Sequence, residues 1–236
     1  GGFPELPGII GGYYARHDGE ADSVARAIAT HYRPQGPTDD VPETPTAKAV
    51  ALADKIDTLV GFFGIGEKPT GSKDPFALRR AALGVIRIIL DAELSLPLAT
   101  LLQMAAENFQ FDAVDEDILP FIRDRLRVYL RDQNMRHDVI AAALADSSGD
   151  DVCRMVDEAQ SLADFLADAD GAGLMAGWRR VSSMLSVEEK KAKKSFLATT
   201  DPALFNDVEK RLHMALVAVP NSDVDFASKL TALGQL

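Results

Sequence analysis

The chain has 236 residues, 47% of them hydrophobic and 7% aromatic, and its formal net charge is −11. The excess of alanine and leucine over aromatic residues favours helices packed on helices, in one large domain or two small ones. Cys153 is the only cysteine, which excludes an intramolecular disulfide framework and a thiolate zinc site and fits a reducing cytoplasm.

The chain carries no sign of a membrane segment. It has no apolar run of about 18 residues, so no transmembrane helix is predicted, and its N-terminus has no signal-peptide pattern. It begins Gly1-Gly2-Phe3 and ends at Gln235-Leu236 within a helical pattern. Both ends are therefore interpreted as cut points in a longer protein.

Positive charge is concentrated in three segments. The net charge is +4 from Lys68 to Arg87, +3 from Arg123 to Arg136 and +4 from Arg179 to Lys194, which leaves −22 elsewhere. This distribution argues against a protein that binds nucleic acid with its whole surface, but it suits contact with a polyanion at chosen places. Ordinary solvated helices would give the same composition, and composition alone favours that simpler interpretation.

The first half of the chain predicts helices separated by proline-rich loops. Residues 1–12 are expected to form a loop leading into a short helix, and residues 21–32 have helical spacing. Four prolines between Arg33 and Pro45 require a loop. A strong helix is predicted over Thr46–Phe63, with Asp54 and Asp57 on its polar side. Its predicted core face comprises Ala49, Leu52, Ile56, Leu59, Val60 and Phe63.

The pair Asp74-Pro75 predicts the start of the next helix, with the aspartate as N-cap and the proline at the first helical position. Arg80 and Arg87 are seven residues apart and are expected on the face opposite the core, free for a partner. The predicted core face comprises Leu78, Ala81, Ala82, Val85, Ile88 and Ile89.

The rest of the chain also predicts helices, and no segment alternates with the period of a strand. The expected ranges are 96–108, 115–133, 137–145, 150–167, 174–186, 188–197, 202–217 and 224–236. Candidate linkers are Asp146–Asp150 and Ala169–Gly173. The prediction is therefore an all-α chain with a larger unit over 1–150 and a smaller one over 151–236.

The adjacent pair His17-Asp18 is typical of the HD phosphohydrolase superfamily, in which such a pair binds a divalent metal. A metal site needs further ligands, and no histidine precedes His17. Asp54 or Asp57 could supply a late carboxylate. A loop that caps the helix starting near Ala21 is the preferred interpretation.

The loop Lys68–Lys73 contains glycine and precedes a helix N-terminus, where backbone N–H groups favour an anion. It lacks the Walker spacing and a preceding strand, and Asp74 would repel phosphate. Contact with an RNA backbone and a purely structural turn, with arginines paired to Asp54 or Asp57, are equally compatible with these residues. The cations concerned are Lys68, Lys73, Arg80 and Arg87.

A second basic stretch starts at Trp178-Arg179-Arg180 and continues with the lysines of Lys190–Lys194. Such a helix could contact phosphates. An amphipathic core helix followed by a solubilising loop is the more usual meaning of this pattern. No nucleophile triad, zinc spacing or dinucleotide fingerprint is present.

Several runs resemble β subunits of the bacterial two-subunit glycyl-tRNA synthetase. The resemblance is dense over residues 1–90 and looser over 120–236. Arg179–Leu185 resembles the opening of an anticodon-binding domain shared with arginyl-tRNA synthetase, although Ser183 stands where the family has asparagine. The densest matches are Phe3–Ala15 with His17-Asp-Gly-Glu20, Ala51–Gly66, and Lys68-Pro-Thr-Gly-Ser-Lys-Asp-Pro-Phe-Ala-Leu-Arg-Arg-Ala-Ala-Leu-Gly84.

The resemblance implies an HD-domain-like helical bundle, followed by a smaller and truncated anticodon-binding unit of the DALR type. It implies a cytoplasmic, tRNA-binding fragment that supports ATP-dependent ligation of glycine to tRNA-Gly by the α subunit. ATP and Mg would belong to that α subunit, so no cofactor or catalytic residue is expected here and the isolated fragment should be inactive. Expected partners are tRNA-Gly and the α subunit, with no membrane. The expected tRNA-binding residues are Lys68, Lys73, Arg80, Arg87, Arg179, Arg180, Lys190 and Lys191.

Two other interpretations remain open. One is a metal-dependent HD phosphohydrolase, with a metal at His17, Asp18 and a further cluster. The other is a purely structural module, in which the arginines are buried in ion pairs with Asp54 and Asp57.

Overall fold

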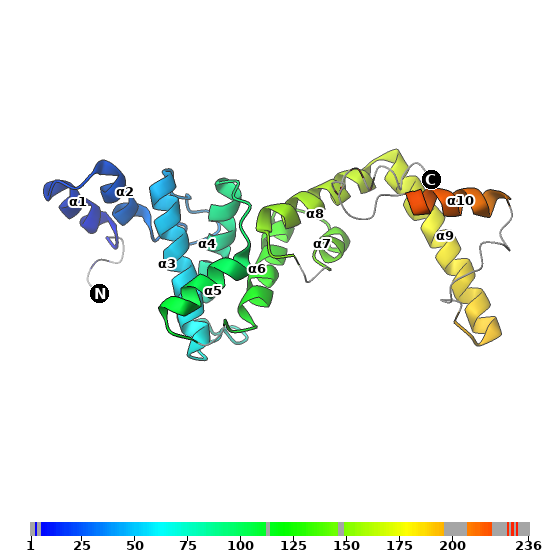
Figure 1. The fold of residues 1–236 in the computed structure, drawn as a ribbon, viewed down its shortest axis with the longest axis horizontal. Coiled ribbons are helices and arrows are strands. Elements are labelled where there is room, and N and C mark those ends of the chain that lie inside the picture. The colour runs from blue at the N-terminus through cyan, green and yellow to red at the C-terminus, as the bar shows by residue number, and fades with distance from the viewer. Residues whose placement is uncertain are drawn as a thin grey trace. The chain divides into compact units, whose positions relative to one another are not determined.

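The computed structural model describes residue 3 and residues 6–111, 114–145, 149–195, 207–218, 226, 228 and 230. Within these residues the chain forms helices α1 to α10 and no strand, which confirms the all-α prediction (Figure 1). The chain divides into two compact units, Gly1–Val156 and Asp157–Leu236. No helix in the described ranges is long and apolar enough to cross a membrane.

The first unit opens with a helical hairpin, α1 (Ile9–His17) and α2 (Asp22–Thr30). Small residues let the two helices approach closely. A Cβ built on Gly12 would lie 2.8 Å from the Cβ of Ala29 and 2.9 Å from the carbonyl oxygen of Ala25. A larger side chain at position 12 would therefore push the hairpin apart.

Helix α3 (Pro45–Gly64) is the centre of the first unit and packs against α2, α4, α5 and α6 (Figure 1). Thr44 caps it, because its hydroxyl accepts a 3.3 Å hydrogen bond from the backbone N–H of Ala47. The predicted core face is confirmed except at Ala49, which is exposed. The buried members are Leu52, Ile56, Leu59, Val60 and Phe63.

Helix α4 (Leu78–Asp91) begins three residues later than the Asp74-Pro75 signal predicted. Ala77 precedes it in the left-handed conformation, with φ 55°, and Pro75 lies in the preceding turn. Asp74 still caps the helix from a distance, because its carboxylate accepts from the backbone N–H groups of Leu78 at 2.8 Å and Arg79 at 3.0 Å. The predicted core face is buried apart from Ala81, and Gly84 and Ile86 join it.

Three further helices complete the core of the first unit: α5 (Leu98–Asn108), α6 (Ile118–Asp132) and α7 (His137–Ala143). The largest fully buried side chains of α5 and α6 are Leu98, Leu102, Ile118, Ile122, Leu126 and Leu130. Burying one such side chain stabilises a fold by about 1.5–3 kcal/mol relative to leaving it exposed. The repeated leucine and isoleucine positions therefore determine how these helices pack.

Helix α8 (Val152–Ala167) spans the division between the units, and α9 (Ala169–Ala192) and α10 (Asp207–Ala218) follow it. The prediction of two helices over 174–186 and 188–197 was wrong, since α9 continues through Ser186 and Val187. The candidate linker Ala169–Gly173 is the first turn of α9. Most of the helix predicted over 224–236 lies outside the described residues.

Candidate nucleic-acid interface

The loop before α4 is held by its own backbone. The Thr70 and Lys73 backbones exchange hydrogen bonds of 3.1 and 2.8 Å, and Gly71 between them has φ 52°. The Arg79 guanidinium donates to the carbonyl oxygen of Gly71 at 2.6 Å. Since the Asp74 carboxylate also occupies N–H groups at the start of α4, this loop is not a cradle for phosphate.

Lys68 has carboxylate partners within the fold. Its ammonium lies 2.7 Å from carboxylate oxygens of both Asp115 and Asp117, which precede α6. The hydrogen bond to Asp115, and then that to Asp117, raises the pKa of Lys68. Partial burial acts to raise the pKa of Asp115, but hydrogen bonds from Lys68 and from the Asp117 backbone outweigh it, so the pKa is lowered. Lys68 thus ties the loop after α3 to the start of α6.

Arg80 and Lys73 differ from Lys68. Both side chains are exposed, and neither has a charged or hydrogen-bonding side-chain partner within the described part of the chain. Arg80 lies on the first turns of α4 and Lys73 on the loop in front of it. These two cations are therefore available to an external anion.

Arg87 was expected beside Arg80 on a free face, and this expectation was wrong. Its guanidinium is half-buried and donates a 2.6 Å hydrogen bond to the carbonyl oxygen of Gly36. Arg87 therefore holds the proline-rich segment after α2 against α4.

Lys55 makes a similar internal contact that sequence reasoning missed. It is 5% exposed, and its ammonium donates to the carbonyl oxygens of His31 at 3.3 Å and Tyr32 at 3.2 Å. Burial lowers the pKa of Lys55. Gly84 makes room for the lysine chain, because a Cβ there would lie 2.5 Å from Lys55 Cε. A glycine in the middle of a strongly helical pattern was the available signal.

The acidic residues of α3 do not neutralise the arginines. Within the described ranges, no ion pair joins Asp54 or Asp57 to any arginine, contrary to the purely structural interpretation. His17 and Asp18 are exposed at the end of α1. No group of three metal-ligating side chains was found among the described residues, so these two are not brought together with a further cluster.

Three of the five arginines in the middle basic segment have internal partners. Arg123 is buried and donates to the carbonyl oxygen of Gly149. Arg125 pairs with its neighbour Asp124, and Arg136 pairs with Asp138 at 2.6 Å. Arg127 and Arg131 are exposed and have no hydrogen-bonding or ion-pair partner among the described residues, so only part of this segment faces outward as free charge.

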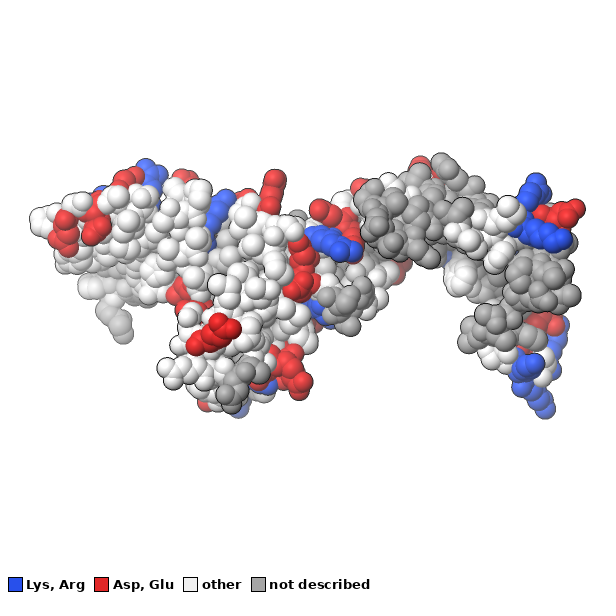
Figure 2. Space-filling model, in the orientation of Figure 1, with Lys and Arg blue, Asp and Glu red and all other residues white. Residues whose placement is uncertain are grey.

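Helix α9 presents cations along an exposed surface. Arg179, Arg180, Lys190 and Lys191 are all exposed, and Lys191 also pairs with Glu188 at 2.7 Å. Arg179 and Lys190 lie about three turns apart on the same side of the helix. Trp178 beside them is 65% exposed. In Figure 2, the Lys and Arg side chains on the face in view form separate small groups.

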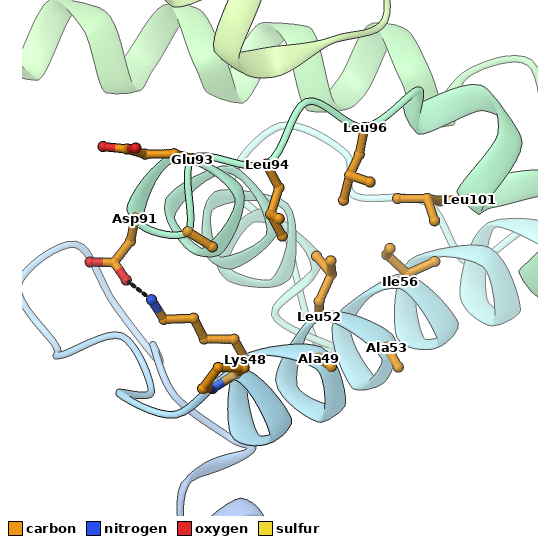
Figure 3. Close-up of a pocket in the computed structure, with 12 residues that line it drawn as sticks. Lys48, Ala49, Leu52, Ala53, Ile56, Asp91, Glu93, Leu94, Leu96 and Leu101 are labelled. Atoms are coloured by element: carbon orange, nitrogen blue, oxygen red, sulfur yellow. Dashed lines mark ion pairs between the residues drawn. The ribbon is translucent and has the colours of Figure 1, made fainter.

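A large apolar groove of the first unit has no unpaired cation among its lining residues. It is a groove of about 660 Å³ between α3, the end of α4 and α5, with the side chains of Leu52, Leu94 and Leu101 along it (Figure 3). Its basic residue, Lys48, pairs with Asp91 at 2.7 Å. The groove therefore does not fit a polyanion.

Comparison with known sequences identifies the family. The profile described as "Glycyl-tRNA synthetase beta subunit" matches residues 1–145. The chain belongs to this family. The match contains the whole run from Lys68 to Gly84 on which the resemblance was based, so that resemblance is confirmed.

Curated relatives extend the similarity to the second unit. Proteins named "Glycine--tRNA ligase beta subunit" are 54% identical over 191 residues in Phenylobacterium zucineum and 48% identical over 217 residues in a Ruegeria species. These alignments cover 81% and 92% of this chain but 27% and 31% of the relatives. A third, from Cereibacter sphaeroides, is 44% identical over the full chain and 36% of its own length. The chain thus spans about a third of a glycyl-tRNA synthetase β subunit.

Proposed function

We propose that this chain is a tRNA-contacting part of a glycine–tRNA ligase, acting within the β subunit beside a catalytic α subunit. Membership of the glycyl-tRNA synthetase β-subunit family supports the ligase assignment. The single observation that supports tRNA contact is the division of cations into two kinds. Some are bound to carbonyl or carboxylate groups of the fold, whereas others are exposed.

Of the eight cations that the resemblance implied, six are exposed and are assigned to tRNA here, although Lys191 also pairs with Glu188: Lys73, Arg80, Arg179, Arg180, Lys190 and Lys191. Contact with a polyanion releases condensed counterions, and each cation that meets a phosphate adds to this effect. Lys68 and Arg87 are removed from the expected set, because their charges are directed to Asp115, Asp117 and the Gly36 carbonyl. In this proposal they maintain the shape of the surface.

The chain itself contributes binding to the reaction. Glycine activation with ATP and Mg is assigned to the α subunit, and no residue of this chain is assigned to catalysis. Positioning tRNA on one subunit for chemistry on another accelerates ligation by lowering the entropic cost of bringing the reactants together. The chain alone is accordingly expected to bind tRNA-Gly without charging it.

A binding comparison tests the proposal. The affinity of the chain for tRNA-Gly and for a non-cognate tRNA is measured with the wild type, with Lys73→Ala/Arg80→Ala, and with Arg26→Ala/Lys48→Ala. The second double variant is a matched control that removes the same charge at residues paired with Asp22 and Asp91. The proposal predicts a loss of affinity of about tenfold or more for the first variant alone. Equal effects of the two variants would show that only net charge matters.

A further inference from the structure

A second pocket of the first unit contains both cations and aromatic rings. It has a volume of about 320 Å³ and lies between the start of α4, the middle of α3 and the segment after α2. The lining residues that matter here are Tyr32, Gln35, Asp54, Lys55, Phe76 and Arg80. Its volume is at the lower end of the range for small-molecule sites. It is separate from the apolar groove, because the two share no lining residue.

A buried cation forms part of the wall. Lys55 is 5% exposed, and its ammonium is hydrogen-bonded to the carbonyl oxygens of His31 and Tyr32. An ammonium has three protons, so one remains without an acceptor among the described residues. The charges of Asp54 and Asp39 act on this ammonium, but neither carboxylate is hydrogen-bonded to it among the described residues, which leaves its third proton for an anion in the pocket.

Arg80 supplies a second cation to the same pocket. Its exposed guanidinium has no hydrogen-bonding partner in the described part of the protein. A guanidinium can contact phosphate through two parallel N–H groups. Lys55 and Arg80 together therefore fit a phosphate group.

Two partly exposed rings also line the pocket. Phe76 is 40% exposed and stacks on Phe62, with ring centroids 4.0 Å apart. Tyr32 is 43% exposed and lies against His31, also at 4.0 Å between centroids. Each ring is thus supported by another ring and keeps an exposed part, as in sites where unpaired bases stack on aromatic side chains.

Asp54 adds a carboxylate to the lining of the pocket. The Asp54 carboxylate accepts no hydrogen bond within the described ranges, and its negative charge acts on the nearby Lys55. The Thr58 hydroxyl donates to the backbone carbonyl oxygen of Asp54 at 2.7 Å. A carboxylate accepts hydrogen bonds from the amino groups of adenine, guanine and cytosine. Uracil has no exocyclic amino group and would be disfavoured.

We propose that this pocket binds one phosphorylated nucleoside with an amino-bearing base. The base stacks on Phe76 or Tyr32 and meets Asp54, while the phosphate meets Arg80 and Lys55. The same chemistry is present in an unpaired nucleotide of RNA and in a free mononucleotide. The RNA source rests on the proposed tRNA function, whereas binding of a free mononucleotide does not.

The test titrates AMP, GMP, CMP and UMP into the chain and its variants by calorimetry. We expect binding of one or more of the first three nucleotides, weaker binding of UMP, and a loss of about tenfold for Phe76→Leu and for Arg80→Ala. Asp54→Asn should reduce the preference for the nucleotides with an amino-bearing base over UMP. The matched control Lys48→Ala should bind like the wild type, and unfolding curves of all variants check that they fold.

The outcomes separate the nucleotide pocket from tRNA binding. Mononucleotide binding that tRNA displaces supports the RNA source, and binding that tRNA leaves unchanged supports a free nucleotide. If tRNA binds but no mononucleotide binds, and Phe76→Leu does not change the affinity for tRNA, the pocket proposal is overturned. The tRNA function then stands. If a mononucleotide binds but tRNA does not, the pocket stands and the tRNA function is overturned.

Discussion

Arg87 Nη1 donates a 2.6 Å hydrogen bond to the carbonyl oxygen of Gly36, a residue 51 positions earlier in the chain. Arg80, two turns before it on α4, has no such partner among the described residues and is exposed. One helix thus carries two arginines with different roles. The structural role of Arg87 and the external role assigned to Arg80 can be separated experimentally.

Replacing Arg87 with alanine should destabilise the first unit, whereas replacing Arg80 should not. A hydrogen bond involving a charged group contributes about 1.5–3 kcal/mol, and its loss leaves the Gly36 carbonyl without that donor. An exposed residue without partners changes stability by about 0.5 kcal/mol or less. Urea unfolding measures both variants, and equal losses would contradict the division of roles.

Gly84→Ala should be destabilising by about 1–3 kcal/mol, because the added Cβ would lie 2.5 Å from Lys55 Cε and 2.7 Å from Lys55 Cδ. The same substitution made on Lys55→Ala should cost less, since the obstructing chain is then absent. Unfolding free energies of the two single variants and the double variant give the coupling. Additive effects would mean that Gly84 and Lys55 do not constrain each other.

The Lys68–Asp115 pair predicts a pH-dependent contribution to stability. The folded pKa of Asp115 is below its usual 3.8. Its contribution to the stability of the fold is therefore complete above pH 3.8 and is lost as the pH falls through the folded pKa. The folded pKa of Lys68 is above its usual 10.5. Its contribution to the stability of the fold is therefore complete below pH 10.5 and is lost as the pH rises through the folded pKa.

Lys68→Met should therefore lower the urea midpoint between these two pH values and have a smaller effect outside them. The comparison with wild type is made at about pH 7, at about pH 2.5 and at about pH 11. The pair is near the surface, so a modest difference is expected. A difference that does not change across the three pH values would exclude an electrostatic origin.

Trp178 should report contact between α9 and RNA. It is the only tryptophan of the chain, is 65% exposed and precedes Arg179 and Arg180. Bound tRNA should change its fluorescence by stacking or by altered solvation. Arg179→Ala/Arg180→Ala should reduce that change at equal tRNA concentration. An undiminished signal would remove these arginines from the proposed interface.

Local patterns in the sequence predicted most helices and most of the core. The apolar spacing of α3 and α4 is sufficient for that, since only one predicted core residue of each helix is not buried. Helix ends were less predictable. Asp74 caps α4 from four residues away, and no pattern separates such a distant cap from a direct one.

The internal partners of the cations could not be predicted from the sequence. Arg87 and Gly36 are 51 residues apart, and Lys68 and Asp115 are 47 apart, so both contacts depend on how the helices pack. Helix periodicity placed Arg87 opposite the core of α4 without showing that another segment covers that face. The buried Lys55 was missed for the same reason.

The salt dependence of tRNA-Gly binding is the most direct test of the central claim that exposed cations of this chain contact tRNA phosphates. The logarithm of the binding constant is measured against the logarithm of salt concentration for the wild type, Lys73→Ala/Arg80→Ala and the control Arg26→Ala/Lys48→Ala. The account predicts a slope shallower by about 1.5 for the first variant, since each lost phosphate contact removes about 0.7–0.9, and little change for the control. An unchanged slope in the first variant, with its fold intact, would contradict the claim.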